Sequence, residues 1–307
     1  MDWQPLLITV APNGARKNQS DHTALPMTAN EMARDAKQCL DAGAAMLHLH
    51  VRDENGAHSL DADLYRASIK AVREVVGDNM IIQITTEAVG QYTPDQQIAL
   101  VQDVLPEAAS VAMKELTADG LDKASDFYHW AFESGITLQH ILYSPEEVSQ
   151  LADLVREGIV PGENLNVLYV LGRYGAQLSQ PSDLLPFLAA AREQDLQTAM
   201  WSVCAFGPGE GAVAVLTISL GGHMRVGFEN NFYLNDETLA PNNAALVTQV
   251  ADGAKLIARS LCQAEQARSL MGSGGKGERK DPLAKTSNGL EDSKNTSTTF
   301  TTRETTI

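Results

Sequence analysis

Eight short apolar runs alternate with longer helical patterns along most of this 307-residue chain. Each run has the length of a β-strand, and the stretch that follows it has the apolar spacing of a helix. This alternation is the feature that most restricts the fold. The predicted strands cover residues 6–13, 46–52, 81–87, 110–116, 137–143, 166–172, 198–206 and 223–230.

The helical stretches carry recognisable boundary signals. Thr28, followed three residues later by Glu31, has the pattern of a capping box and is expected to open a helix that ends near Gly43. A second helix is predicted over residues 61–76, where Gly-Asp-Asn stops it. Further helices are expected to begin at Thr93, Ser144 and Gln180, each of which is followed by a proline, the last of them running to Arg192.

Eight strand–helix units in about 250 residues predict a single (β/α)8 TIM barrel of the α/β class. The alternative is a doubly wound open sheet, which would place a glycine-rich phosphate turn after the first strand. Residues 11–16, Ala-Pro-Asn-Gly-Ala-Arg, do not form one. The barrel domain is predicted over residues 1–271. Residues 272–307 are rich in Gly, Ser, Thr and Lys and are expected to form a disordered tail, with a non-native origin left open.

Composition narrows the class of partner. The formal net charge is −16 and the pI is about 4.8, which argues against nucleic acid or an anionic membrane surface as partner. The three cysteines, Cys39, Cys204 and Cys262, have no metal-like or disulfide-like spacing and are expected to be reduced. No signal peptide and no apolar run of membrane-spanning length are evident. These features predict a cytoplasmic protein.

Two histidines separated by one residue lie in the second predicted strand. Side chains alternate along a strand, so His48 and His50 project from the same face, while Leu47, Leu49 and Val51 project from the other. Active sites of TIM barrels lie at the carboxyl ends of the strands, which is where this pair falls. The pair therefore indicates part of a metal site, and a structural pair of hydrogen-bonded histidines is the alternative. Four other histidines, His22, His58, His129 and His140, fit no ligand spacing and are taken as ordinary, and His223 lies at the amino-terminal end of the last predicted strand.

The last predicted strand offers a third ligand. Arg225 and Glu229 share a strand face and are expected to point into the barrel. The first and last strands of a closed barrel are neighbours, so Glu229 can approach His48 and His50 and complete a site of two histidines and one glutamate. An ion pair between Arg225 and Glu229 with only a structural role is the alternative.

At this point the residues resemble a known family, the β-keto acid cleavage enzymes, whose best-known type cleaves 3-keto-5-aminohexanoate. The resemblance covers residues 6 to about 270. Its most specific parts are the segments 48–53, His-Leu-His-Val-Arg-Asp, and 221–229, Gly-Gly-His-Met-Arg-Val-Gly-Phe-Glu. Supporting matches lie at residues 25–28, 82–86 and 170–172.

The resemblance implies a zinc-dependent TIM barrel that assembles as a homotetramer. It also implies a reaction in which a β-keto acid and acetyl-CoA give acetoacetate and a new acyl-CoA. Carried over to this chain, His48, His50 and Glu229 correspond to the zinc ligands, with one Zn2+ per chain. Arg225 corresponds to the partner of the substrate carboxylate, and Thr85 stands where the family often has a serine beside the substrate.

The chain departs from the family pattern at several positions. Asn230 replaces the aspartate proposed as general base, and an amide cannot accept that proton at neutral pH. Glu115 is the expected replacement, with Glu87 as a second candidate. The early Thr-Gly-Ala-Glu motif reads Asn-Gly-Ala-Arg from Asn13, and a family glutamate corresponds to Gln139. Asn13 and Asn230 are expected to join Thr85 and Arg225 in binding the substrate, and the changed charges predict a different substrate side chain.

Two other functions stay open on the sequence. A metal-dependent hydrolase of the amidohydrolase type also uses His-x-His at a barrel strand end. That class needs further histidines on the fifth and sixth strands, where this chain offers only His140, and an aspartate on the eighth, where it has Asn230. A barrel that keeps the metal but has lost turnover would be a binding protein, and only Asn230 favours that interpretation.

Overall fold

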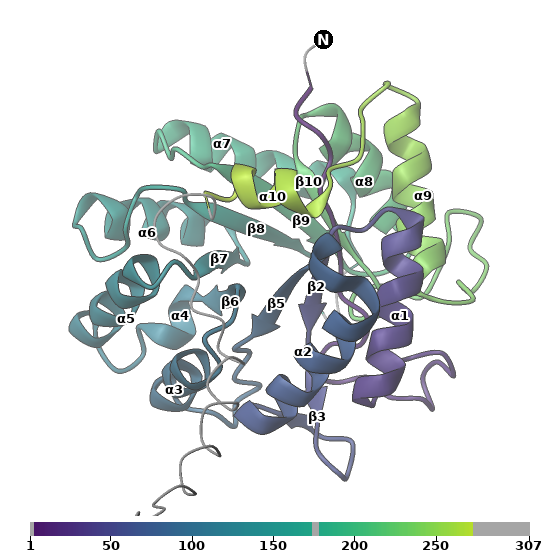
Figure 1. Ribbon diagram of the computed structural model, residues 1–307. Coiled ribbons are helices and arrows are strands. Elements are labelled where there is room, and N and C mark those ends of the chain that lie inside the picture. The colour runs from purple at the N-terminus through teal and green to yellow at the C-terminus, as the bar shows by residue number, and fades with distance from the viewer. Residues whose placement is uncertain (1–2, 174–177, 273–307) are drawn as a thin grey trace, which may run out of the picture. The chain divides into compact units, whose positions relative to one another are not determined.

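The computed structural model describes residues 3–173 and 178–272 (Figure 1). Eight parallel strands form a closed barrel in the order β1-β10-β9-β8-β7-β6-β5-β2, so the predicted TIM-barrel fold is confirmed. These strands are β1 (Ile8–Val10), β2 (Met46–Leu49), β5 (Ile81–Thr85), β6 (Ala108–Ala112), β7 (Thr137–Leu142), β8 (Asn166–Leu171), β9 (Met200–Ala205) and β10 (His223–Val226).

Helices surround the barrel strands (Figure 1). They are α1 (Ala29–Ala42), α2 (Ala62–Val76), α3 (Pro94–Val104), α4 (Met113–Leu116), α5 (Leu121–Glu133), α6 (Pro145–Arg156), α7 (Leu185–Glu193), α8 (Glu210–Ser219), α9 (Asn243–Lys255) and α10 (Ala264–Leu270), with short 3-10 helices η1 (Gly77–Asn79) and η2 (Pro181–Leu184). The described helices include none that is long and apolar enough to cross a membrane.

The capping residues predicted for α1, α3 and α6 make the expected hydrogen bonds at the start of each helix. The Thr28 hydroxyl accepts a hydrogen bond from the Glu31 amide, and the Glu31 carboxylate accepts one from the Thr28 amide, which completes the capping box of α1. Gly43 ends this helix in the left-handed conformation. Thr93 and Ser144 cap α3 and α6, each with a proline in the first turn. The helix expected from residue 180 instead begins as η2 and continues as α7.

All eight strands are shorter than predicted, and at three of them the residues left over adopt another structure at the carboxyl end of the barrel. The strand predicted over residues 110–116 ends at Ala112, and Met113–Leu116 form α4. The second strand ends at Leu49, after which β3 (Val51–Arg52) and β4 (His58–Ser59) form a separate antiparallel hairpin. The strand predicted to residue 230 ends at Val226, because Gly227 turns the chain at φ +138°. A Cβ at Gly227 would lie 2.4 Å from the Ala11 carbonyl oxygen, so only glycine fits this turn.

The amino-terminal end of the barrel is closed by apolar packing. Inward-facing residues of several strands form one layer with residues of α10 and its flanks, namely Leu7, Met46, Ile81, Ala108, Met200, Cys262, Ala264, Ala267 and Met271. A filled amino-terminal end leaves the carboxyl ends of the strands as the place for chemistry. Apart from Gly272, the tail predicted over residues 272–307 lies outside the described residues.

A buried carboxyl between α1 and α9 predicts a pH dependence of folding. Asp35 Oδ2 lies 3.1 Å from Asn243 Nδ2 and accepts its hydrogen bond, and burial raises the pKa of this carboxyl to about 7. The folded pKa exceeds the unfolded one, so this contribution to stability is present at low pH and is lost as the pH rises toward 7. From about pH 5 to about pH 8, the wild-type free energy of unfolding should fall by about 2–3 kcal/mol more than that of Asp35→Asn.

Urea denaturation of the two proteins at both pH values measures this difference. An asparagine at position 35 keeps an oxygen that can accept the Asn243 hydrogen bond, so the comparison isolates the titration. Contributions from all other groups cancel between the two proteins. Equal pH dependence of the two free energies would contradict the assignment.

Candidate active site

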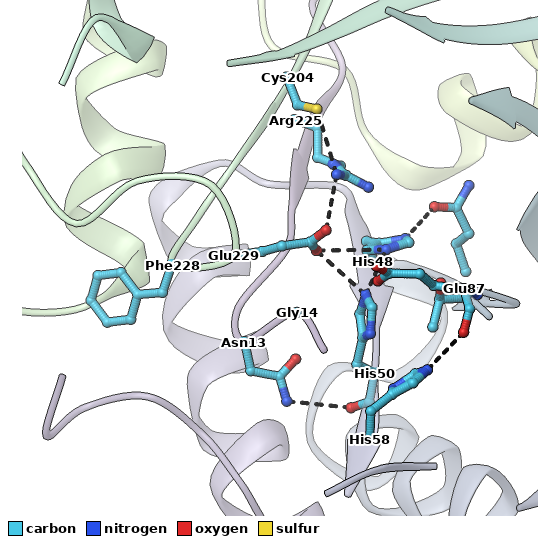
Figure 2. Close-up of polar contacts among 12 residues, drawn as sticks. Asn13, Gly14, His48, His50, His58, Glu87, Cys204, Arg225, Phe228 and Glu229 are labelled. Atoms are coloured by element: carbon cyan, nitrogen blue, oxygen red, sulfur yellow. Dashed lines mark hydrogen bonds and ion pairs between the residues drawn. The ribbon is translucent and has the colours of Figure 1, made fainter. Parts of the chain in front are cut away.

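Three predicted metal ligands meet at the carboxyl end of the barrel. One donor atom from each of His48, His50 and Glu229 lies within 4.8 Å of the other two, and all three residues are buried. The two Nε2 atoms of the histidines are 3.1 Å apart. Glu229 Oε2 lies 3.6 Å from His48 Nε2 and 3.5 Å from His50 Nε2 (Figure 2).

The neighbouring strand fixes the tautomer of His48. His48 and Gln83 are register partners on β2 and β5, and His48 Nδ1 lies 2.7 Å from Gln83 Oε1. Gln83 Nε2 in turn donates to Gln139 Oε1 on β7 at 3.2 Å. The His48 Nδ1 therefore carries the proton, and its Nε2 lone pair faces the cluster. Burial, aided by the Arg225 charge, lowers the pKa of His48 to about 3, which keeps the ring neutral.

This arrangement suits a divalent cation. The His48 lone pair on β2 and the Glu229 carboxylate in the turn after β10 converge on one buried point beside His50 Nε2. Glu229 Oε2 has no hydrogen-bond donor among the described residues. Two neutral imidazoles and one carboxylate are a donor set typical of catalytic zinc, which leaves a coordination position open. A metal would satisfy all three groups at once.

Glu229 is charged and is held from several sides. Burial disfavours the ionised form, but the Arg225 guanidinium is the main group that opposes this effect, and the pKa of the Glu229 carboxyl lies well below its usual range. Arg225 Nη2 donates to Glu229 Oε1 at 3.1 Å and contacts Cys204 Sγ at 3.5 Å (Figure 2). The predicted pairing of Arg225 with Glu229 is therefore present, although Glu229 lies beyond the strand.

The turn that carries Glu229 is braced by residues that sequence reasoning missed. The Glu229 amide donates to the Ala11 carbonyl at 3.1 Å, and the Phe228 amide donates to Asn243 Oδ1 at 2.8 Å. Lys17 Nζ donates to the Phe228 carbonyl at 2.7 Å, and burial lowers the pKa of this lysine to about 8. No local pattern marks these contacts, because each joins segments far apart in the sequence.

The other predicted substrate residues line the same end of the barrel. Thr85 is buried, and because Gln83 faces inward, Thr85 two residues later on β5 faces inward too. Asn13 Nδ2 donates to the His50 carbonyl at 3.4 Å and to the Pro26 carbonyl at 3.0 Å. The Oδ1 atom of Asn13 and both polar side-chain atoms of Asn230 are buried without a hydrogen-bond partner among the described residues. These groups are thus available to a ligand.

The two candidate bases occupy different surroundings. Glu115 lies on α4 rather than on a strand, and its Oε2 accepts hydrogen bonds from the Ala88 amide at 3.2 Å and from Gln97 Nε2 at 2.8 Å. Its carboxylate therefore holds α3 to the loop after β5. Glu87, by contrast, is directed toward the histidine pair in Figure 2. Burial, the largest cause, raises the pKa of Glu87.

His58 also belongs to this neighbourhood, although its spacing gave no sign of it. The β3–β4 hairpin returns the chain so that the His58 ring lies 5.2 Å from the His50 ring, centroid to centroid. His58 fits no ligand spacing in the sequence and is expected to be ordinary, whereas the structure places its ring beside that of His50.

Comparison with known proteins identifies the family. The sequence profile of the beta-keto acid cleavage enzymes matches residues 5–272, almost the whole described chain. The chain belongs to the β-keto acid cleavage enzyme family. The resemblance found in the His48 and Glu229 segments is thus confirmed over the barrel. These two segments supply the buried cluster of His48, His50 and Glu229.

Characterised relatives match over nearly their full length. A 3-keto-5-aminohexanoate cleavage enzyme from Fusobacterium nucleatum is 28% identical over 275 residues, which cover 87% of this chain and 98% of the relative. A 3-oxoadipate:acetyl-CoA acetyltransferase from Cupriavidus necator is 27% identical over 275 residues, covering 88% and 95% of the two chains. The apo structure of ObcA is similar in fold, with a TM-score of 0.67 and 18% identity over 81% of this chain and 65% of that chain.

Proposed function

We propose that this family member exchanges acyl groups between a β-keto acid and acetyl-CoA, giving acetoacetate and a new acyl-CoA. The observation that carries the proposal is the buried cluster of His48, His50 and Glu229 with Arg225 beside it, in a chain of this family. The relative from Cupriavidus necator is named for a reaction with acetyl-CoA, which supports the same co-substrate here.

The cluster is proposed to hold one Zn2+ per chain, which when bound would act as a Lewis acid toward the keto and carboxylate oxygens of the substrate. Arg225 would pair with the substrate carboxylate, because a planar guanidinium fits a carboxylate better than the ammonium group of a lysine does. Thr85, the unpartnered Oδ1 atom of Asn13 and the side-chain amide of Asn230 would bind the rest of the substrate.

The reaction needs a base for the proton on C2, between the keto and carboxylate groups. We propose Glu87 for this role in place of Glu115, because its side chain is directed toward the histidine pair while Glu115 is engaged with Ala88 and Gln97. Deprotonated C2 attacks the acetyl carbonyl and releases the CoA thiolate. The thiolate then attacks C3, the bond between C2 and C3 breaks, and acetoacetate leaves as C2 takes up a proton.

The hydrolase alternative lacks support from the structure. Its class needs histidines that face the site from the fifth and sixth strands, and His140 on β7 packs its ring against Tyr128 of α5, with centroids 5.4 Å apart. Tyr128 belongs to the helix layer, so His140 faces away from the barrel interior. The remaining alternative is a metal-containing binding protein, and only a measurement of turnover distinguishes it from an enzyme.

A homotetramer is part of the proposal. Large apolar side chains are exposed on and between α8 and α9 and their adjoining loops, including Val215, Leu220, Leu239 and Leu256. Val215 and Leu256 line one hollow between these two helices, and exposed apolar groups of this kind are typical of a surface that another subunit covers. Light scattering on the purified protein measures the assembly, and a monomer at micromolar concentration would contradict it.

The proposed activity is tested by following new CoA esters by mass spectrometry. Protein of measured metal content is incubated with acetyl-CoA and a panel of β-keto acids whose side chains are cationic, anionic or neutral. We expect acetoacetate and one new acyl-CoA in equal amounts. The preferred substrate should reflect the charges that differ from the family pattern. Zinc-loaded protein that exchanges no substrate of the panel would contradict the acyl exchange and favour a binding protein.

A further inference from the structure

His58 lies directly behind the metal-facing histidine His50. It is 5% exposed, and it enters the site from the β3–β4 hairpin rather than from a barrel strand. Arg52 of the same hairpin is its register partner. Figure 2 shows the His58 ring beneath His50, on the side away from Glu229.

Hydrogen bonding determines which nitrogen of His58 carries the proton. His58 Nε2 lies 2.9 Å from the backbone carbonyl oxygen of Glu87. A carbonyl oxygen only accepts, so Nε2 must be the protonated donor. The Nδ1 of the neutral ring is then an acceptor. It is buried, and it has no hydrogen-bond partner among the described residues.

His50 has the complementary requirement. Its Nε2 faces Glu229 Oε2 at 3.5 Å and would bind the metal through its lone pair. The proton of the ring must then lie on Nδ1, which becomes a buried donor. His50 Nδ1 likewise has no partner among the described residues. One buried donor and one buried acceptor without partners thus lie on neighbouring rings.

We propose that His58 Nδ1 accepts the Nδ1 proton of His50, directly or through one buried water, and so positions His50 for the metal. The inference rests on the proposed metal site. Ligand histidines generally donate their second N–H to an acceptor, which fixes the tautomer and strengthens the ligand. Gln83 serves His48 in this way at 2.7 Å, and His58 gives His50 the equivalent partner. His58 is not itself a ligand, because the donor atoms that lie within 4.8 Å of one another belong to His48, His50 and Glu229.

The test compares zinc affinity, measured by competition with a chromogenic chelator, in wild-type protein and three variants. His58→Phe keeps a ring of similar shape but removes the acceptor, and His58→Gln restores an acceptor oxygen. His140→Phe is the matched control, since it replaces a buried histidine on the outer side of the barrel wall. We expect His58→Phe to weaken zinc binding by about 10–100-fold, with partial recovery in His58→Gln and no change in the control.

A second readout separates positioning from a merely structural role. Cobalt(II) reports the ligand field by its visible spectrum, which should change in His58→Phe at saturating metal and not in the control. Wild-type affinity and spectrum in a folded His58→Phe would overturn the proposal, as would equal losses in His58→Phe and His58→Gln. If wild-type protein bound no zinc, the proposed function itself would fail. Zinc binding without acyl exchange would refute only the reaction and leave the role of His58 standing.

Discussion

His48→Ala is expected to abolish zinc binding and to reduce acyl exchange by about 1,000-fold or more. A Lewis acid in such a site contributes several kcal/mol to the transition state, and every 1.36 kcal/mol is a factor of ten in rate. The variant removes a buried ligand whose Nδ1 is fixed by Gln83. Metal content by atomic emission and initial rates of acyl-CoA formation measure the two effects.

The control is His140→Ala, which removes a histidine equally buried but turned toward Tyr128. It should keep one zinc per chain and near wild-type turnover. Both variants cost some folding stability, so thermal unfolding of the metal-free proteins shows whether His48→Ala is folded. Removal of zinc from wild-type protein by a chelator should reproduce the loss, and added zinc should restore activity. Full exchange by a metal-free His48→Ala protein would refute metal-assisted catalysis.

Glu87→Gln is expected to lower turnover by about 100- to 10,000-fold, the usual contribution of a general base, while zinc binding is retained. The amide keeps the size of the side chain but cannot take the C2 proton. Exchange of C2 hydrogen for deuterium, followed by nuclear magnetic resonance, reports this step alone. The enzyme-dependent part of the exchange should disappear in the variant.

Glu115→Gln is the matched comparison. Its amide oxygen can still accept the hydrogen bond from the Ala88 amide, so the loop after β5 should stay in place. We expect turnover within about tenfold of wild type for this variant, because its carboxylate is engaged with Ala88 and Gln97 rather than with the site. The reverse result, with C2 exchange lost in Glu115→Gln and kept in Glu87→Gln, would return the role of base to Glu115.

The sequence predicted most of what local chemistry decides. The alternation of strands and helices, the capping residues Thr28 and Ser144, and the common face of His48 and His50 each depend on neighbouring residues. Repeated eight times, this alternation was enough to predict the barrel, which the strand order confirms. The family could also be named, because its two longest motifs are continuous segments.

The failures of prediction lie where a strand gives way to a loop. Periodicity extended the last strand to residue 230, but the Ala11 carbonyl leaves no room for a Cβ at Gly227, and the chain turns there. Glu229 still reaches the histidines, although by a turn and not by strand parity. The strand predicted over residues 110–116 likewise included Glu115, which lies on α4.

Sequence patterns were sufficient to predict the barrel, the family and the residue types able to bind a metal. The orientation of these residues emerged only from the folded chain: Gln83 lies against His48, His58 lies behind His50, and Glu87 rather than Glu115 is directed toward the histidine pair. Secondary structure and motifs arise from interactions over a few residues, whereas these contacts depend on how separate segments pack. Gln83 meets His48 through the register of β2 and β5, and His58 reaches His50 because the β3–β4 hairpin turns the chain back.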